Sequence, residues 1–290
     1  MTNEYKKDHC WQYDIRVNNL KEDIEISGLS EDEINNLRIT DFTFHFIPKT
    51  DKEGFSEAKK FIERHEWLGK LSNYPTHLFV AKYKNILAGV VVMDMPVAFS
   101  SLLGEKTKKL ERLVSRGACI SWSPKNLASS LIMWGIKWMV KNTDYRLFTA
   151  YSDPEAKELG TIYQACNFIY LGQKSGTPKM YQTPSGKWVS DRYFRCRSFY
   201  KRVAKAENIE WDMKWQKGDS ILWEFVPEEV SSVLKHVSKT LLGACPVKIQ
   251  PRKHKYLYIL GKDNRETKLL KQEFTKLNPK LSNLKYPKIR

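Results

Sequence analysis

The sequence predicts the α/β (α+β) class, with a mixed central sheet flanked by helices and a basic C-terminal extension. Two observations lead to this prediction. From Glu111 to Gly172, strand-like and helix-like patterns alternate, with a turn signal at each change. Earlier in the chain, residues 39–93 read as a strand, a helix and a hairpin. Strands that alternate with helices indicate parallel strands joined by crossovers, and a hairpin adds antiparallel ones.

The first third of the chain predicts a polar N-terminal segment followed by four secondary-structure elements. Residues 1–38 are polar and acidic in places, with a helix-like SEDEINNL from Ser30. We interpret them as a surface decoration without chemistry. Alternating aromatic residues then predict a half-buried strand, and apolar residues at helical spacing predict a helix. A hairpin follows around Lys84-Asn85. The expected ranges are a strand at 39–47, a helix at 55–71 and strands at 77–83 and 86–93.

The middle of the chain predicts two strand-and-helix units. A strand at 113–120 leads through the polar loop Ser121 to Asn126 into a helix that starts at Leu127. A strand at 145–151 ends at Ser152-Asp153-Pro154, where the carboxylate can cap a helix and proline suits its first position. We therefore expect a second helix at 156–166 and a strand at 168–171.

The remainder divides the chain into three predicted parts. The segment 95–109 is amphipathic and is expected to lie over the site, and residues 188–194 are expected to form the last strand of the sheet. Beyond Ser198 the pattern changes, and from Val247 lysine and arginine are interleaved with aromatics. The predicted parts are an N-terminal decoration at 1–38, a catalytic domain at 39–198 and a basic extension at 199–290 packed on it.

Composition favours an intracellular protein with a polyanionic partner. The net charge of +16 and the pI of about 9.5 favour nucleic acid through steering and counterion release. The alternative is that the excess lysine only keeps a solvated surface soluble. The five cysteines are scattered without a C-x-x-C pair, which is typical of reduced thiols in the cytoplasm. The start is too polar for a signal peptide, and the most apolar stretch, 86–99, is too short to span a membrane.

Two stretches carry a resemblance to known families. The ending IYQACNF is similar to the last helix of the GNAT acyltransferase fold, where a tyrosine precedes a Gly-Phe step, although Asn167 replaces the glycine. RLVSRGACISWSPKNLASS and AYSDPEAKELGTIYQACNFIYLG resemble Mom-like phage DNA-modification proteins, which are GNAT relatives. The resemblance covers Phe61 to Gly172 and resumes at RKHKYLYILG and the terminal YPK. It implies a GNAT-type mixed sheet whose fourth and fifth strands splay apart.

The resemblance implies a set of catalytic residues. Asp153 falls where the fifth strand splays away, and a carboxylate there can take a proton from an attacking amine. Tyr163 matches the tyrosine that donates a proton to the leaving group. The alternatives are a helix cap for Asp153 and a buried core position for Tyr163. The further candidates are Tyr151 and Ser152 beside them, Arg112 for an oxyanion or phosphate, and Glu66 in HEWLG near the acceptor.

The donor is expected at the start of the helix that follows residue 126. GNAT enzymes hold the pyrophosphate of acyl-CoA on a Gly-rich loop, but residues 121–126 contain no glycine. The candidate donor-binding residues are Ser123, Lys125, Asn126, Ser129 and Ser130. Ser123 or Asn126 can instead serve only as the helix cap. The donor is accordingly either acetyl-CoA or an aminoacyl ester such as glycyl-tRNA.

A basic run near the C-terminus predicts the nucleic-acid contact, where cations meet phosphate beside aromatic rings that can stack on bases. A solvated basic strand is the alternative. None of the six histidines has firm metal-ligand spacing to another ligand, so no metal site is predicted. The candidate nucleic-acid-binding residues are Arg252, Lys253, His254, Lys255, Tyr256, Tyr286 and Lys288.

The resemblance implies a DNA-modifying transferase. Its expected reaction is acyl or glycyl transfer to the exocyclic N6 of adenine, leading to a carbamoylmethyl-type adenine that shields phage DNA from restriction in the host cytoplasm. Its expected partners are double-stranded or locally flipped DNA and, for an aminoacyl donor, tRNA, with no membrane. The alternatives are an N-acetyltransferase that uses acetyl-CoA on a protein or small amine, and a catalytically silent DNA-binding protein.

Overall fold

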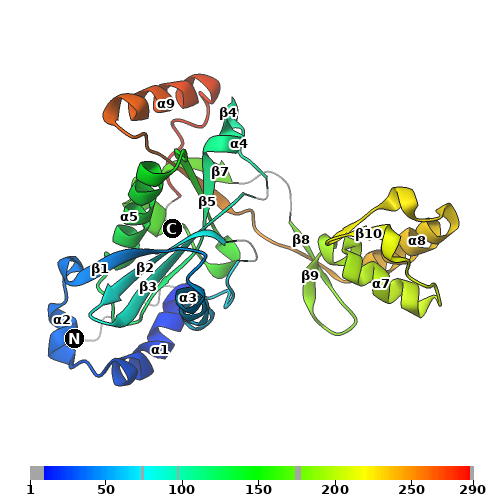
Figure 1. Cartoon of the computed structure of the whole chain (residues 1–290), viewed down its shortest axis with the longest axis horizontal. Coiled ribbons are helices and arrows are strands. Elements are labelled where there is room, and N and C mark those ends of the chain that lie inside the picture. The colour runs from blue at the N-terminus through cyan, green and yellow to red at the C-terminus, as the bar shows by residue number, and fades with distance from the viewer. Residues whose placement is uncertain (1–9, 73–74, 97, 174–177, 288–290) are drawn as a thin grey trace. The chain divides into compact units, whose positions relative to one another are not determined.

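The computed structural model describes residues 10–72, 75–96, 98–173 and 178–287. The chain forms two compact units (Figure 1). Unit 1 consists of residues 1–174 and 253–290, and unit 2 of residues 175–252. Unit 2 is therefore an insertion in unit 1, whereas the predicted boundary lay at residue 198.

A seven-stranded mixed sheet forms the centre of unit 1. Its strand order is β1-β2-β3-β5-β6-β13-β7, in which β5 and β6 run parallel and the other neighbours run antiparallel. This confirms the predicted class and the GNAT-type sheet that the resemblance implies. The strands are β1 (Phe42–Ile47), β2 (Pro75–Tyr83), β3 (Ile86–Asp94), β5 (Glu111–Cys119), β6 (Leu147–Ser152), β7 (Ile169–Gln173) and β13 (His254–Ile259).

Helices cover both faces of this sheet (Figure 1). α5 (Leu127–Asn142) packs on β2 and β3, where Gly135 lets the helix approach the ring of Phe79 closely. α3 (Lys52–His65) packs on β3 and β5, and α1 (Trp11–Ser27) packs on α3. The predicted helix that starts at Leu127 and the predicted hairpin are confirmed. α2 (Glu31–Asn36) follows α1 and begins with a capping box made by Ser30 and Glu33.

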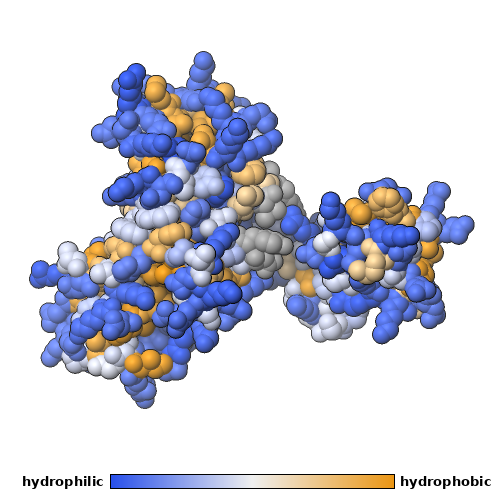
Figure 2. All heavy atoms as spheres, in the orientation of Figure 1, coloured by the Kyte–Doolittle hydropathy of each residue, from blue (hydrophilic) through white to orange (hydrophobic). Residues whose placement is uncertain are grey.

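The segment predicted to lie over the site packs elsewhere. It forms β4 (Leu102–Glu105) and α4 (Thr107–Leu110), and Leu102 and Leu103 join a core with Phe274 of α9 (Asn264–Leu277). The amide nitrogen of the Asn278 side chain donates to the Leu102 carbonyl at 2.8 Å. Figure 2 shows apolar residues on the outer surface of α9 among polar ones.

The last strand of the sheet is not the predicted one. Residues 188–194 form β9 (Trp188–Ser190) and a 3-10 helix, and β9 belongs to a three-stranded sheet in unit 2. The central position between β6 and β7 is taken by β13, which the sequence placed in the basic extension. The other elements of unit 2 are β8 (Lys179–Gln182), α7 (Arg197–Ala206), β10 (Gln216–Lys217), β11 (Ser220–Ile221), α8 (Glu228–Ala244) and β12 (Val247–Ile249).

The helix predicted at 156–166 is broken. A 3-10 turn at Pro154–Ala156 is followed by α6 (Thr161–Ala165), and Lys157 and Gly160 between them adopt left-handed backbone angles. A left-handed residue ends regular helix geometry, so residues 157–160 form a turn instead. Within the described residues, no helix is both long and apolar enough to cross a membrane.

Candidate functional site

Strands β5 and β6 diverge halfway along the sheet. Their pairing runs only from Glu111 opposite Leu147 to Val114 opposite Ala150. Beyond this point β5 continues beside β3, and Ser115 is an extra residue between the pairs that Val114 and Arg116 make with β3. Such a bulge bends a strand and increases its twist. The end of β6 and the rest of β5 are therefore not paired with each other.

An acidic cluster lies at this divergence, formed by Glu66, Asp153 and Glu158. Burial, together with the negative charges of Glu66 and Asp153, raises the pKa of Glu158 from 4.5 to about 7. Hydrogen bonds from the Asp153 backbone and the Trp67 side chain act in the opposite direction. A carboxyl group that titrates near neutrality can both accept and release a proton at physiological pH. Glu158 is the chemically distinctive member of the cluster.

Glu66 comes from the loop after α3. Burial raises its pKa, whereas Arg116 and the backbone N–H groups of Leu68 and Gly69 lower it. The Leu68 N–H donates to the carboxylate at 2.9 Å. Arg116 lies just past the bulge in β5 and donates to the Lys70 carbonyl at 3.2 Å, which holds the loop against the strand. The acidic cluster therefore has one member on the loop after α3 and two on the segment after β6, and Arg116 of β5 lies close enough to lower the pKa of Glu66.

Asp153 follows directly after β6. Its carboxylate accepts from the Glu155 N–H at 3.0 Å, as the cap reading predicts, and forms an ion pair with Lys253 at 2.8 Å. The Asp153 side chain is only 14% exposed. Lys253 was predicted to contact nucleic acid, but its ammonium group is directed at this carboxylate. The ion pair places a positive charge beside the acidic cluster.

Tyr163 in α6 belongs to the same group of residues. Its ring contacts Phe168 and Tyr256, with centroid distances of 5.4 Å in both cases. Loss of solvent raises the pKa of the phenol, and the charges of Glu158 and Glu66 raise it further. The phenol is therefore neutral at pH 7 and can donate its proton. The structure brings Asp153, Glu66 and Tyr163 together around Glu158.

Gly160 fixes the start of α6. Its φ is +68°, and a Cβ there would lie 2.5 Å from the ring of Tyr256. We expect Gly160→Ala to lower the free energy of unfolding by about 2 to 4 kcal/mol, through backbone strain and displacement of the buried ring. Urea unfolding measures the loss. Gly28→Ala is the control because it has φ +64° with open space around it, and a loss as large there would contradict the role given to Tyr256.

The structure does not bring the other three catalytic candidates together. They are Tyr151, Ser152 and Arg112. Adjacent residues of a strand point to opposite faces. Ser152 is buried, and its hydroxyl has no hydrogen-bond partner among the described residues. Tyr151 is on the opposite face, toward the buried Glu111 carboxylate. Arg112 is buried at the start of β5, with its guanidinium over the Tyr145 ring at 3.6 Å. The structure does not bring Arg112 to the divergence; Arg116 occupies that place.

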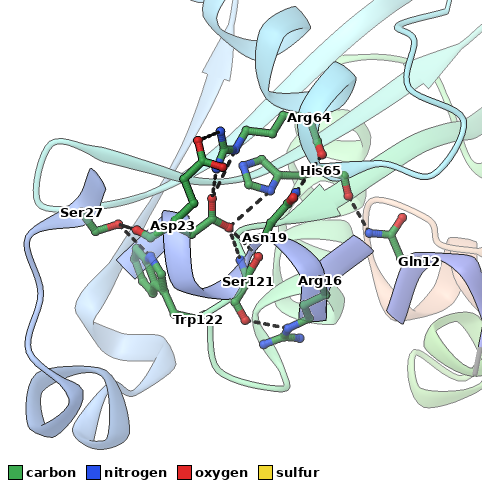
Figure 3. A network of polar contacts seen from close by, with 10 residues as sticks. Gln12, Arg16, Asn19, Asp23, Ser27, Arg64, His65, Ser121 and Trp122 are labelled. Carbon is green, nitrogen blue, oxygen red and sulfur yellow. Dashed lines mark hydrogen bonds and ion pairs between the residues drawn. The ribbon is translucent and has the colours of Figure 1, made fainter. Parts of the chain in front are cut away.

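The predicted donor loop is held by α1 (Figure 3). Arg16 donates to the Ser121 carbonyl at 2.7 Å and also to the Ser123 carbonyl. Asp23, only 2% exposed, accepts from the N–H and the hydroxyl of Ser121. The indole N–H of Trp122 donates to the Ser27 hydroxyl at 2.7 Å. Residues predicted to be a surface decoration therefore fix the loop before α5.

The same helix also holds the loop that carries Glu66. Gln12 donates to the His65 carbonyl at 2.6 Å and accepts from the Trp67 N–H at 3.2 Å. Asn19 donates to the Arg64 carbonyl at 3.0 Å. We call the residues of α1 that bind the two loops the α1 stripe, and Figure 3 shows them along one side of the helix. The α1 stripe consists of Gln12, Arg16, Asn19, Asp23 and Ser27.

The start of α5 offers partial support for an acyl-CoA phosphate. Neither Ser123 nor Asn126 caps the helix with its side chain, so the cap reading is wrong for both. The Ser123 hydroxyl is buried and has no hydrogen-bond partner among the described residues. Ser129 and Ser130 line a cavity of about 380 Å³ with Lys137 and Cys166. The support is limited, because the Leu127 and Ser130 N–H groups and the Ser129 hydroxyl already donate to carbonyls, and Lys137 lies ten residues into the helix.

The predicted nucleic-acid residues are largely internal to unit 1. Tyr256 is fully buried, and its hydroxyl donates to the Leu159 carbonyl, so it cannot stack on a base. His254 is buried against the Tyr170 hydroxyl, 2.7 Å from its Nδ1. Tyr286 donates to the Phe168 carbonyl at 2.6 Å. Lys255 lies with its ammonium 5.8 Å from the centre of the Tyr151 ring.

Two of the seven remain to be placed. Arg252 is exposed at the end of unit 2, and Lys288 lies outside the described residues. The part of the chain that the structure describes holds no group of three or more His, Cys, Asp or Glu side chains arranged to bind a metal ion.

Sequence reasoning missed Glu158, Arg116 and the α1 stripe. Glu158 was placed inside the predicted helix at 156–166, although a glycine such as Gly160 often interrupts a helix. Arg116 lies in RLVSRG, where Arg112 was chosen instead. The α1 stripe is polar and has no apolar periodicity, which is the signal that marks a packed helix.

Comparison with solved structures finds acetyltransferases at low identity. A putative acetyltransferase from Salmonella typhimurium with acetyl-CoA matches with a TM-score of 0.35 and 12% identity over 51% of this chain and 88% of that one. A GNAT family acetyltransferase from Elizabethkingia anophelis with acetyl-CoA bound matches with a TM-score of 0.33 and 11% identity over 76% and 99%. An aminoglycoside acetyltransferase from an uncultured soil metagenomic sample matches with a TM-score of 0.34 and 12% identity over 44% and 88%.

Comparison with curated proteins finds no match. The model of the Mom protein family matches residues 47–288, which is most of the chain and includes the whole of unit 2. The matched range contains the diverging strands, the acidic cluster, α6 and β13. This chain therefore belongs to the Mom protein family.

Proposed function

We propose that this protein transfers an acyl group, most simply glycyl, to the exocyclic N6 of adenine in DNA and that the product becomes a carbamoylmethyl-type adenine. The observation that carries the proposal is Glu158, a carboxyl group with a pKa of about 7, beside Tyr163 at the divergence of β5 and β6. Family membership and the net charge of +16 support DNA as the acceptor.

The proposed chemistry uses one base and one acid. The adenine N6 attacks the carbonyl of the donor, and ionised Glu158 takes the proton that N6 loses. The bond from that carbonyl to the leaving group breaks, and the neutral phenol of Tyr163 protonates the leaving atom. The charge of Asp153, which is paired with Lys253, contributes to the raised pKa of Glu158. The target adenine must be flipped out or single-stranded to reach these groups.

A glycyl group allows the final product to form without a second enzyme. The free amine of the glycyl adduct attacks C6 of the purine, and the bond from C6 to the original N6 then breaks. The amine nitrogen becomes the new ring substituent, and the original N6 becomes the carboxamide nitrogen. The atoms balance without an oxidant or reductant, whereas an acetyl group has no nitrogen for this step.

Isotope labelling tests both donor and route. We expect purified protein, DNA and tRNA charged with ¹⁵N-glycine to give a modified nucleoside on digestion, with the label on the nitrogen attached to C6. Mass spectrometry with fragmentation locates the label. Tyr163→Phe should lower the yield by about 10- to 1,000-fold if the phenol is the acid. A product formed from acetyl-CoA alone would contradict the glycyl donor, and acetylation of amines without any change in DNA would support an N-acetyltransferase.

A further inference from the structure

The basic residues of unit 2 are concentrated in its first half. Residues 178–206 contain eight lysines and arginines and one acidic residue, whereas residues 207–252 contain six basic and seven acidic residues. The first part therefore has a net charge of +7, from eight basic and one acidic residue, whereas the second part is almost balanced at −1. A surface that only needed to be soluble would not require this separation, because interspersed charges serve solubility as well.

The fold presents this basic half on the outside of α7. Phe199, Tyr200, Val203 and Ala204 are buried in the core of unit 2. The opposite side of the helix carries exposed Arg202 and Lys205. Exposed Arg195 ends the 3-10 helix Asp191–Arg195, which the extended residue Cys196 separates from α7. Arg192 is exposed one turn earlier. We call these four residues, Arg192, Arg195, Arg202 and Lys205, the basic face. Figure 2 shows polar residues over most of the viewed side of unit 2.

Packing on aromatic rings orders part of the basic face. The guanidinium carbon of Arg202 lies 5.0 Å from the centre of the Tyr193 ring and 5.7 Å from that of Phe199. Stacking leaves the edge N–H groups of a guanidinium free to bind phosphate and reduces the entropy lost on binding. Asp191, the one acidic residue of this half, forms an ion pair with Arg195. Arg192, Arg202 and Lys205 are thus the principal cations.

The dimensions of the basic face fit a nucleic-acid backbone. Within α7, Arg202 and Lys205 are three residues apart, which is about 4.5 Å along the helix axis at 1.5 Å per residue. Each strand of B-DNA places a phosphate every ~3.4 Å along the helix axis, so these two side chains can reach neighbouring phosphates. Arg192 in the preceding 3-10 helix adds a third cation, next to Tyr193, whose ring contacts Arg202. Contacts of this kind position a protein on a duplex without reading its sequence.

We propose that the basic face of unit 2 binds the phosphate backbone of double-stranded DNA. The proposal rests on the proposed function for the identity of the nucleic acid. It replaces the run from Arg252 to Tyr256 as the principal contact, because Lys253 is paired with Asp153 and Tyr256 is buried. In this proposal, unit 1 carries out the chemistry and unit 2 retains the DNA.

The test compares two variants of the full chain with equal charge changes. The first carries Arg192→Gln, Arg202→Gln and Lys205→Gln. The control carries Lys214→Gln, Lys217→Gln and Lys239→Gln, which removes three exposed lysines from the other half of unit 2. Fluorescence anisotropy with a labelled 30-base-pair duplex, without any donor, gives the affinity from 50 to 300 mM salt. Circular dichroism and thermal unfolding establish that both variants fold.

We expect the first variant to bind DNA about 10- to 100-fold more weakly at 100 mM salt. The slope of log affinity against log salt should become shallower by about 2 to 3. The control should stay within about threefold of the unchanged protein. Equal weakening of both variants, or an unchanged salt slope in the first, would overturn the proposal. Lost binding to tRNA with intact binding to the duplex would also overturn it, in favour of an RNA surface.

The outcome is separable from the proposed chemistry. Binding is measured on unmodified DNA without turnover, so weaker binding by the first variant supports the basic face even when no modified nucleoside is found. Conversely, the protein could modify adenine while the first variant binds DNA as well as the unchanged protein does. That result would support the proposed chemistry and reject the basic face.

Discussion

Replacing Asp23 with alanine is expected to lower the free energy of unfolding of unit 1 by about 3 kcal/mol. The Asp23 side chain is 2% exposed and accepts from the Ser121 N–H at 3.2 Å and from Arg64 at 2.9 Å. Removing one partner from a buried charged network leaves the others unsatisfied and costs about 3 to 5 kcal/mol. The low end applies because Arg64 is one-third exposed and keeps its ion pair with Glu22.

Urea unfolding followed by circular dichroism measures this loss. Glu22→Ala is the matched control, because it removes the neighbouring carboxylate from the same arginine but at a side chain that is 61% exposed. An exposed ion pair contributes at most about 1 kcal/mol. Asp23→Asn keeps the shape and one acceptor oxygen, so we expect an intermediate loss. If Asp23→Ala cost no more than Glu22→Ala, the α1 stripe would not hold the donor loop.

The α1 stripe shows why residues 1–38 were wrongly predicted to be a surface decoration. An amphipathic helix is recognised by apolar residues at a spacing of three and four, and α1 uses polar residues at that spacing instead. Gln12, Arg16, Asn19, Asp23 and Ser27 keep the register. Their partners are backbone and side-chain groups at the end of α3, in the loop after it and in the loop before α5. A single sequence gives no sign of which loops those are.

Prediction succeeded where periodicity and turn signals agreed. The helix from Leu127, the hairpin around Lys84-Asn85 and the parallel pairing of β5 with β6 all followed from local pattern. The place of β13 did not, because it pairs with strands about a hundred residues earlier, across the inserted unit 2. The sequence also suggested residues 188–194 as the last strand, since they come next along the chain. Strand order depends on such long-range pairing, which local pattern does not encode.

The candidate site was predicted only in part, because local pattern does not show which distant residues come together. Asp153 and Tyr163 could be selected because one ends a strand before proline and the other precedes an ending similar to that of GNAT helices. Glu158 has no local mark, because its raised pKa comes from burial and from the charges of Glu66 and Asp153 on separate segments. Chemistry that depends on tertiary electrostatics becomes visible only when those segments are placed together.

Replacing Glu158 with glutamine is expected to move activity and stability in opposite directions. As the proposed general base, Glu158 should contribute about 100- to 10,000-fold to the rate, and glutamine cannot accept the proton. The pKa of about 7 in the folded protein against 4.5 ordinarily means that the folded state holds this proton more tightly than the unfolded state. Ionised Glu158 therefore opposes folding, fully above pH 7 and not at all below pH 4.5.

The variant should accordingly be more stable than the unchanged protein at pH 8, by about 1 to 3 kcal/mol, with no gain at pH 4. The rate of the unchanged protein should rise with pH to a plateau above about pH 7, and the variant should lose this rise. Urea unfolding at both pH values and the rate of nucleoside modification across pH 5.5 to 8.5 measure the two effects. Glu63→Gln, an exposed carboxylate paired only with Lys59 in the described structure, should change neither by much. A purely structural Glu158 would lose activity and stability together, so a less stable variant at pH 8 would remove Glu158 from the role of base.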